Sequence, residues 1–239
     1  MKAKTLLIAA ATLAVGVFSS NAQVYSQNIV GYVNIPLTAG QFQIVSPALD
    51  ADGTGTNNTV SSVFKTPTIG DTVYAFNGTT FDTINYAIVG SPRTGFQTNW
   101  FNGVTVASSY PLNPGQAVFY LAAANETNTQ VGTVIQGTNL LNKVFPGAGV
   151  FQLVSSQVPI AGGLTSVLGY QPSIGDNVYI FNGVNYDTYN FAVVGSPRTG
   201  FQTNWFNGVV QTEPVLAPGQ GAWIQPASNT NWSQTFSAP

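Results

Sequence analysis

Apolar and polar residues alternate over short stretches of the chain, and Gly, Pro and Asn separate these stretches. Residues 96–101 place Phe96 and Trp100 on one side of an extended strand and Asn99 on the other, because strand side chains alternate. Beyond one apolar run near the N-terminus, no segment has a helical period. The pattern predicts an all-β protein of antiparallel strands.

Two-residue Asn-Gly turns are a strong signal for β-hairpins. Asn77-Gly78 lies between two such runs, and a turn there sets Tyr74 opposite Phe81 and Val73 opposite Asp82. Tyr74 and Phe81 then share one face, which we predict to be core, and the Asp face is predicted to be solvated. The other Asn-Gly pairs are Asn102-Gly103, Asn182-Gly183 and Asn207-Gly208. A turn at Asn182-Gly183 sets Tyr179 opposite Tyr186 and Val178 opposite Asp187. Pro114-Gly115 and Pro218-Gly219 predict type II turns.

The chain repeats itself. The sixteen residues 89–104 recur unchanged as 194–209, and residues 39–46 recur in similar form as 148–155. We therefore predict two tandem antiparallel β-sandwich or barrel-like repeats of about 105 residues, at 23–130 and 131–239.

The N-terminus has the pattern of a signal peptide. Lys2 and Lys4 precede an apolar run over residues 6–18, and Ser20 and Ala22 suit cleavage after Ala22. A retained anchor is the alternative, but the run is shorter than the roughly 20 residues of a membrane-spanning helix. We predict a signal peptide at 1–22 and an exported protein, located outside the cell, on its surface or in the periplasm, without a membrane span.

Charge is scarce. Only 6% of the residues are charged, against about 25% in ordinary soluble domains, and the chain after the leader has four cations against eight carboxylates. No basic surface for nucleic acid is expected. The absence of His and Cys excludes thiol nucleophiles, Ser-His-Asp triads and His-ligated metals within this chain. We predict a protein that is not an enzyme and has no cofactor.

Two kinds of carboxylate pairing are possible. With Asn77-Gly78 as the turn, Asp71 and Asp82 form a diagonal pair roughly 7–8 Å apart, which is compatible with a glycosidase, although a solvated structural pair is favoured. Arg93 and Arg198 follow Asp82 and Asp187 by eleven residues. A structural Asp-Arg pair is the favoured role of each arginine, and contact with a ligand is the alternative.

The repeated block also contains a candidate sugar site. Trp100 beside Asn99, and Trp205 beside Asn204, combine an aromatic platform with amides that bind hydroxyl groups. Burial of both tryptophans in the core is the competing interpretation. Together with Arg93 and Arg198, these residues form the hypothetical ligand-binding set.

One loop is rich in oxygen ligands. Asp50 and Asp52 begin a segment that resembles a calcium loop but departs from the EF-hand pattern, with Gly53 at the fourth position. Residues 159–163 of the second half lack its carboxylates. A plain turn is favoured, with calcium as a weak candidate.

Residues 29–34, the Phe-Asn-Gly hairpin followed by Asp-Thr, and the Pro-Gly-Gln turn before 118–120 and 222–224 resemble a family of exported tandem-repeat β proteins of environmental Gram-negative bacteria. The resemblance implies export and repeat architecture, and it implies no site. Our first hypothesis is a structural or assembly protein of the cell surface or extracellular matrix, whose partner is a second copy or another surface protein. The reason is that sheet edges are usually guarded by Lys, which is nearly absent here. The alternative is a polysaccharide-binding module with one weak site per repeat.

Overall fold

A computed structural model describes residues 29–236, apart from 138, 139, 141, 146, 148 and 199. The predicted signal peptide at 1–22 lies outside the described residues. The described chain is all-β, with one four-residue helix, and no helix in it is long and apolar enough to cross a membrane.

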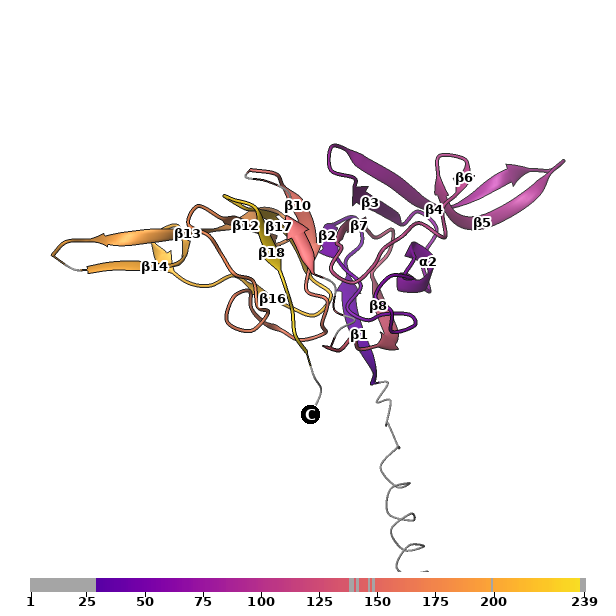
Figure 1. Ribbon diagram of the computed structural model, residues 1–239. Coiled ribbons are helices and arrows are strands. Elements are labelled where there is room, and N and C mark those ends of the chain that lie inside the picture. Colours follow the sequence, from indigo (N-terminus) through magenta and orange to yellow (C-terminus); the bar gives the residue numbers. More distant parts are fainter. Residues whose placement is uncertain are drawn as a thin grey trace, which may run out of the picture.

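Two six-stranded antiparallel sheets have the same strand order (Figure 1). The first has the order β2-β7-β3-β4-β5-β6, and the second has β10-β17-β12-β13-β14-β15. Neither sheet closes on itself, so the barrel-like form is not found in the described part of the chain. The strands of the first sheet are β2 (Phe42–Val45), β3 (Thr72–Phe76), β4 (Phe81–Ser91), β5 (Gly95–Asn102), β6 (Thr105–Val106) and β7 (Val118–Leu121); those of the second are β10 (Gln152–Ser155), β12 (Asn177–Phe181), β13 (Tyr186–Ser196), β14 (Gly200–Asn207), β15 (Val210–Gln211) and β17 (Gly221–Gln225).

The remaining strands form three two-stranded antiparallel sheets. They are β1 (Val30–Leu37) with β8 (Glu126–Thr133), β9 (Lys143–Phe145) with β18 (Thr230–Trp232), and β11 (Gly162–Gly163) with β16 (Val215–Leu216). Strand β8 runs across the boundary that the sequence suggested at 130/131. The helix α2 (Val60–Val63) begins at a capping box, in which Thr59 and Ser62 exchange side-chain-to-backbone hydrogen bonds. At four residues it is too short to produce a helical period.

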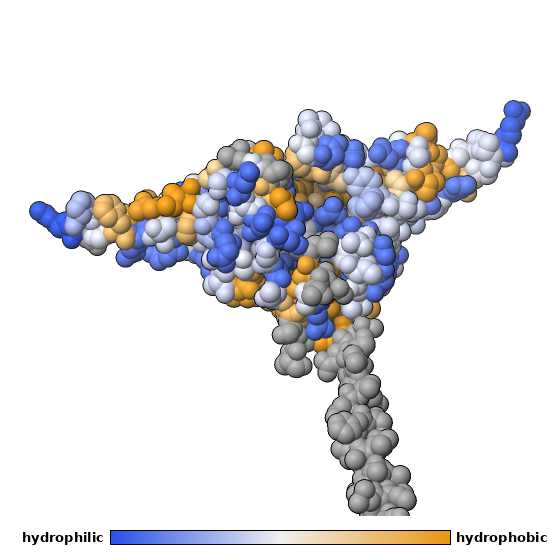
Figure 2. All heavy atoms as spheres, viewed as in Figure 1, coloured by the Kyte–Doolittle hydropathy of each residue, from blue (hydrophilic) through white to orange (hydrophobic). Residues whose placement is uncertain are grey.

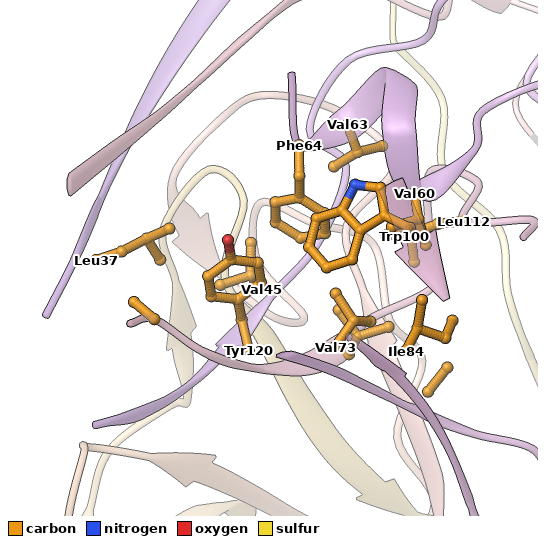
Figure 3. Close-up of a cluster of buried hydrophobic side chains, with 13 residues drawn as sticks. Leu37, Val45, Val60, Val63, Phe64, Val73, Ile84, Trp100, Leu112 and Tyr120 are labelled. Carbon is orange, nitrogen blue, oxygen red and sulfur yellow. The ribbon is translucent and has the colours of Figure 1, made fainter. Parts of the chain in front are cut away.

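Each sheet covers its own hydrophobic core. Figure 3 shows the first core, where Trp100 lies beside Phe64 and Val60, and the ring of Phe64 lies 4.5 Å from that of Tyr120. In the second core the rings of Trp205 and Trp232 lie 6.4 Å and 6.0 Å from the ring of Tyr170. Since burial of apolar surface is the main driving force of folding, each core stabilises the sheet that covers it.

The turn of each hairpin lies one residue later than predicted, so each cross-strand partner is shifted by two residues. Strand β3 pairs with β4 so that Phe76 faces Phe81 and Val73 faces Ile84; the predicted pairs Tyr74–Phe81 and Val73–Asp82 are wrong. Gly78, with φ +101°, takes the first central position of the turn, and no described residue other than glycine has positive φ. A type I′ turn would need positive φ at both central residues, whereas type II′ needs it only at the first. The turn at Gly183 has the same form.

In that second hairpin Phe181 faces Tyr186 and Val178 faces Tyr189, so the predicted pairs Tyr179–Tyr186 and Val178–Asp187 are also wrong. The shift is an even number of residues, so each side chain stays on its predicted face. The prediction of which face is core was nevertheless inverted. The small aliphatic residues Val73 and Ala75 lie in the core, and the aromatic face is turned toward the other half of the molecule.

The two Pro-Gly turns form as predicted. Gly115 has φ +87°, and the backbone N–H of Gln116 donates to the carbonyl of Asn113 at 3.0 Å. Gly219 has φ +75°, and Gln220 donates to Ala217 at 3.0 Å. Positive φ at the third position is the requirement that glycine meets in a type II turn.

Candidate functional site

The two halves meet through equivalent elements. The backbone N–H of Ser46 donates to the carbonyl of Gly219 at 2.9 Å, and that of Ser155 donates to the carbonyl of Gly115 at 3.2 Å. Ser46 and Ser155 occupy matching positions in the two halves, as do Gly115 and Gly219. Each half therefore contributes its Pro-Gly turn to the other, in an approximately two-fold arrangement like the isologous contact of a homodimer.

Aromatic rings fill the space between the sheets. Phe76 lies 4.9 Å from Trp223, and the matching pair, Phe181 and Phe119, lies at 6.0 Å. Both distances join ring centroids and fall in the favourable range for aromatic pairs. Around the buried residues Ile44, Ala117 and Leu153, these rings form a third cluster that belongs to neither core alone.

The cluster opens to solvent in two adjoining aromatic clefts. The first cleft has a volume of about 360 Å³ and the second about 370 Å³. The first is lined by Phe42, Tyr74, Phe81 and Phe119 with Phe181 and Tyr186 of the second half; the second is lined by Phe151, Tyr179, Tyr186 and Trp223 with Phe76 of the first half.

The aromatic linings make both clefts suited to binding apolar groups. Phe42 and Phe151, which match between the halves, are each 41% exposed, and no charged or amide side chain lines either cleft. Open clefts of this size and composition bind planar or aliphatic groups by burial of apolar surface. The sequence signal was present, because an aromatic residue stands at each of these positions in both halves, but the faces were assigned the wrong way round.

Two arms project from the molecule. The arms are the outer parts of β4–β5 (residues 87–99) and of β13–β14 (residues 192–204), and they point to opposite sides (Figure 1). Figure 2 shows hydrophilic residues at their ends and apolar residues behind them. Phe96 and Phe201, at matching places on the arms, are each 64% exposed. Most of each arm lies within the repeated sixteen-residue block, so the two arms present nearly the same surface.

The tryptophans of the predicted sugar site are buried instead. Trp100 and Trp205 are each 1% exposed, and the indole N–H of Trp205 donates to Thr165 at 2.9 Å. Neither ring is accessible for stacking on a sugar. Asn99 and Asn204 each accept, with the side-chain oxygen, the backbone N–H of the following tryptophan at 2.9 Å. The core interpretation of Trp100 and Trp205 is the one that matches the structure.

The arginines are far from the aspartates assigned to them. Arg93 lies at the end of the first arm, whereas Asp82 lies at the start of the eleven-residue strand β4, so about 30 Å of extended chain separates them. No ion pair joins them, and Arg198 and Asp187 are likewise at opposite ends of β13. The predicted Asp-Arg pairs are wrong, because the eleven-residue strands β4 and β13 carry the turns that hold the arginines to the far ends of the arms. The arginines are also not brought together with Trp100 or Trp205.

Asp71 and Asp82 do not form a diagonal pair. Asp82 faces Ala75, and the backbone of Asp71 bonds to that of Tyr86, which puts the two about four residues, or roughly 13 Å, apart along the sheet. That separation exceeds the roughly 6.5–9.5 Å of an inverting glycosidase. Asp71, predicted to be solvated, is fully buried.

Asp71 and its counterpart Asp176 are structural. Asp71 accepts the hydroxyl of Tyr120 at 2.6 Å and the backbone N–H of Ala123 at 2.7 Å. Asp176 accepts the hydroxyl of Tyr170 at 2.7 Å. Burial, together with the adjacent carboxylates, raises the pKa of Tyr120 and Tyr170, so both hydroxyls stay protonated as donors.

Glu126 is the unusual member of this group. Its carboxylate accepts the hydroxyls of Thr68 at 2.9 Å and Tyr120 at 3.1 Å, so it shares Tyr120 with Asp71. Burial, and then the charge of Asp71, raise the pKa of Glu126. Both carboxylate oxygens of Glu126 already accept hydrogen bonds, and only a small recess lies beside this residue. The pair formed by Glu126 and Asp71 therefore has no room for a substrate.

Most carboxylate oxygens of the weak calcium candidate are bonded within their own loop, but Oδ1 of the buried Asp50 has no hydrogen-bond partner. Asp50 accepts the backbone N–H groups of Asp52 and Gly55, and Asp52 accepts from Thr54 and Asn57. The bonds to Asn57 and Thr54 lower the pKa of Asp52. Within the described ranges, no group of three or more Asp, Glu, His or Cys side chains could hold a metal ion.

No protein-family model, no curated protein and no solved structure matches the chain.

Proposed function

We propose that the chain is a non-enzymatic structural protein, exported to the cell surface, the extracellular matrix or the periplasm, that works by self-association or by joining other surface proteins. We also propose that its halves are tandem copies of one β-sandwich unit of the exported repeat family noted above. The leader pattern supports export. The shared strand order of the two sheets supports the duplication.

The observation that carries the assembly function is the pair of exposed arms. Strand β3 accompanies β4 only as far as Asn85, and no strand lies along the outer edges of residues 87–91 and 95–99 among those described. An isolated two-stranded ribbon is marginally stable in water, and open edges favour pairing with other chains. Neither arm carries Lys or a carboxylate, the usual guards of such edges.

The test is the association state of the protein that begins at Gln23. Light scattering and negative-stain microscopy over a range of concentrations are expected to show oligomers or filaments without any additive. The arm variant Phe96→Ser with Phe201→Ser is expected to shift the assembly toward monomer. Tyr32→Ser, which removes an equally exposed ring from β1, serves as the matched control. A wild-type protein that stays monomeric at every concentration would refute the assembly function.

A glycan-binding module is the second candidate. It is favoured by the half-exposed rings of the clefts, such as Phe42 and Phe151, on which a sugar could stack. Retention of the wild-type monomer on a polysaccharide column, lost in Phe42→Ser with Phe151→Ser, would support it. Scattering that is unchanged by a panel of polysaccharides would count against it.

A further inference from the structure

We propose that the arm of one copy docks in an aromatic cleft of another copy. The proposal rests on the assembly function above and specifies its contact. It joins two surfaces that the structure leaves uncovered, namely the apolar face of each arm and the aromatic lining of each cleft.

The arm presents a compact apolar face. On the first arm Phe96 lies opposite Gly90, and Ile88 lies opposite Thr98, so Phe96 and Ile88 share one face as diagonal neighbours. Both side chains are more than half exposed. The second arm offers Phe201 and Val193 in the same geometry. One ring beside one aliphatic side chain suits an apolar cleft of 360–370 Å³.

Charge also favours contact between arm and body. The arms carry Arg93 and Arg198 and no carboxylate, whereas the rest of the described chain carries all eight carboxylates and only Lys65 and Lys143. An arm is therefore attracted to the acidic body of another copy and weakly repelled by another arm. This asymmetry favours contact between an arm and the body of another copy over contact between two arms, and the aromatic lining then favours the clefts within that body.

The number of arms and clefts and the direction of the arms favour a second copy of the chain as the occupant of each cleft. Each chain has two nearly identical arms and two matching clefts. The arms point away from the centre of the molecule (Figure 1). The clefts are lined by rings of both sheets where the two halves meet, so an arm does not reach a cleft of its own chain. A contact between unlike surfaces that does not close on itself produces an open assembly.

A sugar fits the clefts less well. Sugar sites need amide or charged groups to bond the hydroxyls, and the only polar groups lining the clefts are tyrosine hydroxyls. The hydroxyl of Tyr179 is already bonded to Gln225 at 3.3 Å. The apolar arm of a second copy needs no such partners.

The decisive experiment is complementation between variants of the protein that begins at Gln23. The arm variant (Phe96→Ser, Phe201→Ser) keeps both clefts, and the cleft variant (Phe42→Ser, Phe151→Ser) keeps both arms. Each is expected to be monomeric alone by light scattering, while an equimolar mixture regains complexes at a concentration at which neither variant associates. Tyr32→Ser is expected to assemble like the wild type. Melting curves establish that each variant is folded.

The outcomes separate this contact from the general function. If both variants are monomeric and the mixture also stays monomeric, an intact arm and an intact cleft do not bind each other, and the inference fails while self-assembly of the wild type stands. A cleft variant that assembles normally also overturns it. If the wild type does not assemble, the proposed function fails as well.

A second experiment tests the same contact by disulfide crosslinking and removes no aromatic side chain. The chain has no cysteine, so Thr98→Cys on an arm and Thr188→Cys, opposite Tyr179 on the aromatic face, can be placed in separate copies. Oxidation of their mixture is expected to give a disulfide-linked heterodimer at least several-fold more abundant than that formed with Thr127→Cys on β8. Equal yields would contradict docking at the cleft.

Discussion

Gly221 and Ala117 occupy matching positions in the two sheets and face each other across the boundary between the halves. A methyl group built on Gly221 would lie 2.4 Å from the Cβ of Ala117 and 2.6 Å from Ile44. The approximate two-fold relation thus brings one position of the repeat into contact with its own copy. Only one of the two can carry a side chain, which explains why this pair differs.

The first prediction follows from that contact. Gly221→Ala is expected to lower the free energy of unfolding by about 1–3 kcal/mol, as overpacking in a close-packed region does. Moving the methyl group across the boundary, with Gly221→Ala and Ala117→Gly together, is expected to recover part of the loss, because the contact with Ile44 remains. Urea unfolding of the three variants measures the coupling, and a double variant no more stable than Gly221→Ala would show that the halves do not meet here.

The second prediction concerns the buried carboxylate Asp176. Tyr170→Phe removes a charge-assisted hydrogen bond and is expected to cost about 1.5–3 kcal/mol in unfolding free energy. Tyr179→Phe removes only the 3.3 Å bond to Gln225 at a half-exposed site, and it is expected to cost under about 1 kcal/mol. Similar losses in the two variants would mean that Asp176 does not depend on Tyr170.

The third prediction is a pH dependence centred on Glu126. Its pKa is raised in the folded state, so its stabilising contribution is complete below the ordinary value of 4.5 and is lost as the pH rises through the folded pKa. Glu126→Gln, which keeps an acceptor for Tyr120 and removes the charge, is expected to have the higher Tm at pH 7. The difference should close toward pH 4. A variant that melts below the wild type at pH 7 would reverse the sign argued here.

The fourth prediction tests the separation of Arg93 from Asp82. Arg93→Ala on an exposed arm end is expected to change the free energy of unfolding by less than about 0.5 kcal/mol. Asp82→Ala is expected to cost more, because Asp82 accepts the hydroxyl of Tyr110 at 2.8 Å. Burial and this carboxylate raise the pKa of Tyr110 to about 12. The double variant should be additive within about 0.5 kcal/mol, and a larger coupling would restore the ion pair.

Local features of the fold were predictable from the sequence. The β character follows from the alternation of side chains, and the turns at Gly115 and Gly219 follow from the special φ that only glycine adopts freely. The hairpin register was missed because an Asn-Gly pair is compatible with two turns, and the choice depends on whether Asn77 adopts positive φ. The four-residue helix α2 gives no periodic signal.

The candidate site was less predictable for a different reason. Alternation identifies two faces of a strand but does not say which one is core when the second is also covered. Here Val73 faces the core and Phe76 faces the other half, so both faces are partly buried and the larger residues are on the less buried face. The arms depend on how far β4 runs past β3, which is fixed by the lengths of neighbouring strands and not by β4 itself.

The reciprocal contact between the halves has a consequence for the timing of synthesis. The aromatic rings of β2, β3 and β7 are covered by β10, β12 and β17, which follow roughly 100 residues later in the chain. At about 5–20 residues per second, a ribosome needs on the order of 5–20 s to supply that cover. During this interval a first half that has already folded exposes Phe76 and Phe119 to other nascent chains. A first half that folds before the second half is available is therefore prone to associate with other chains through these rings.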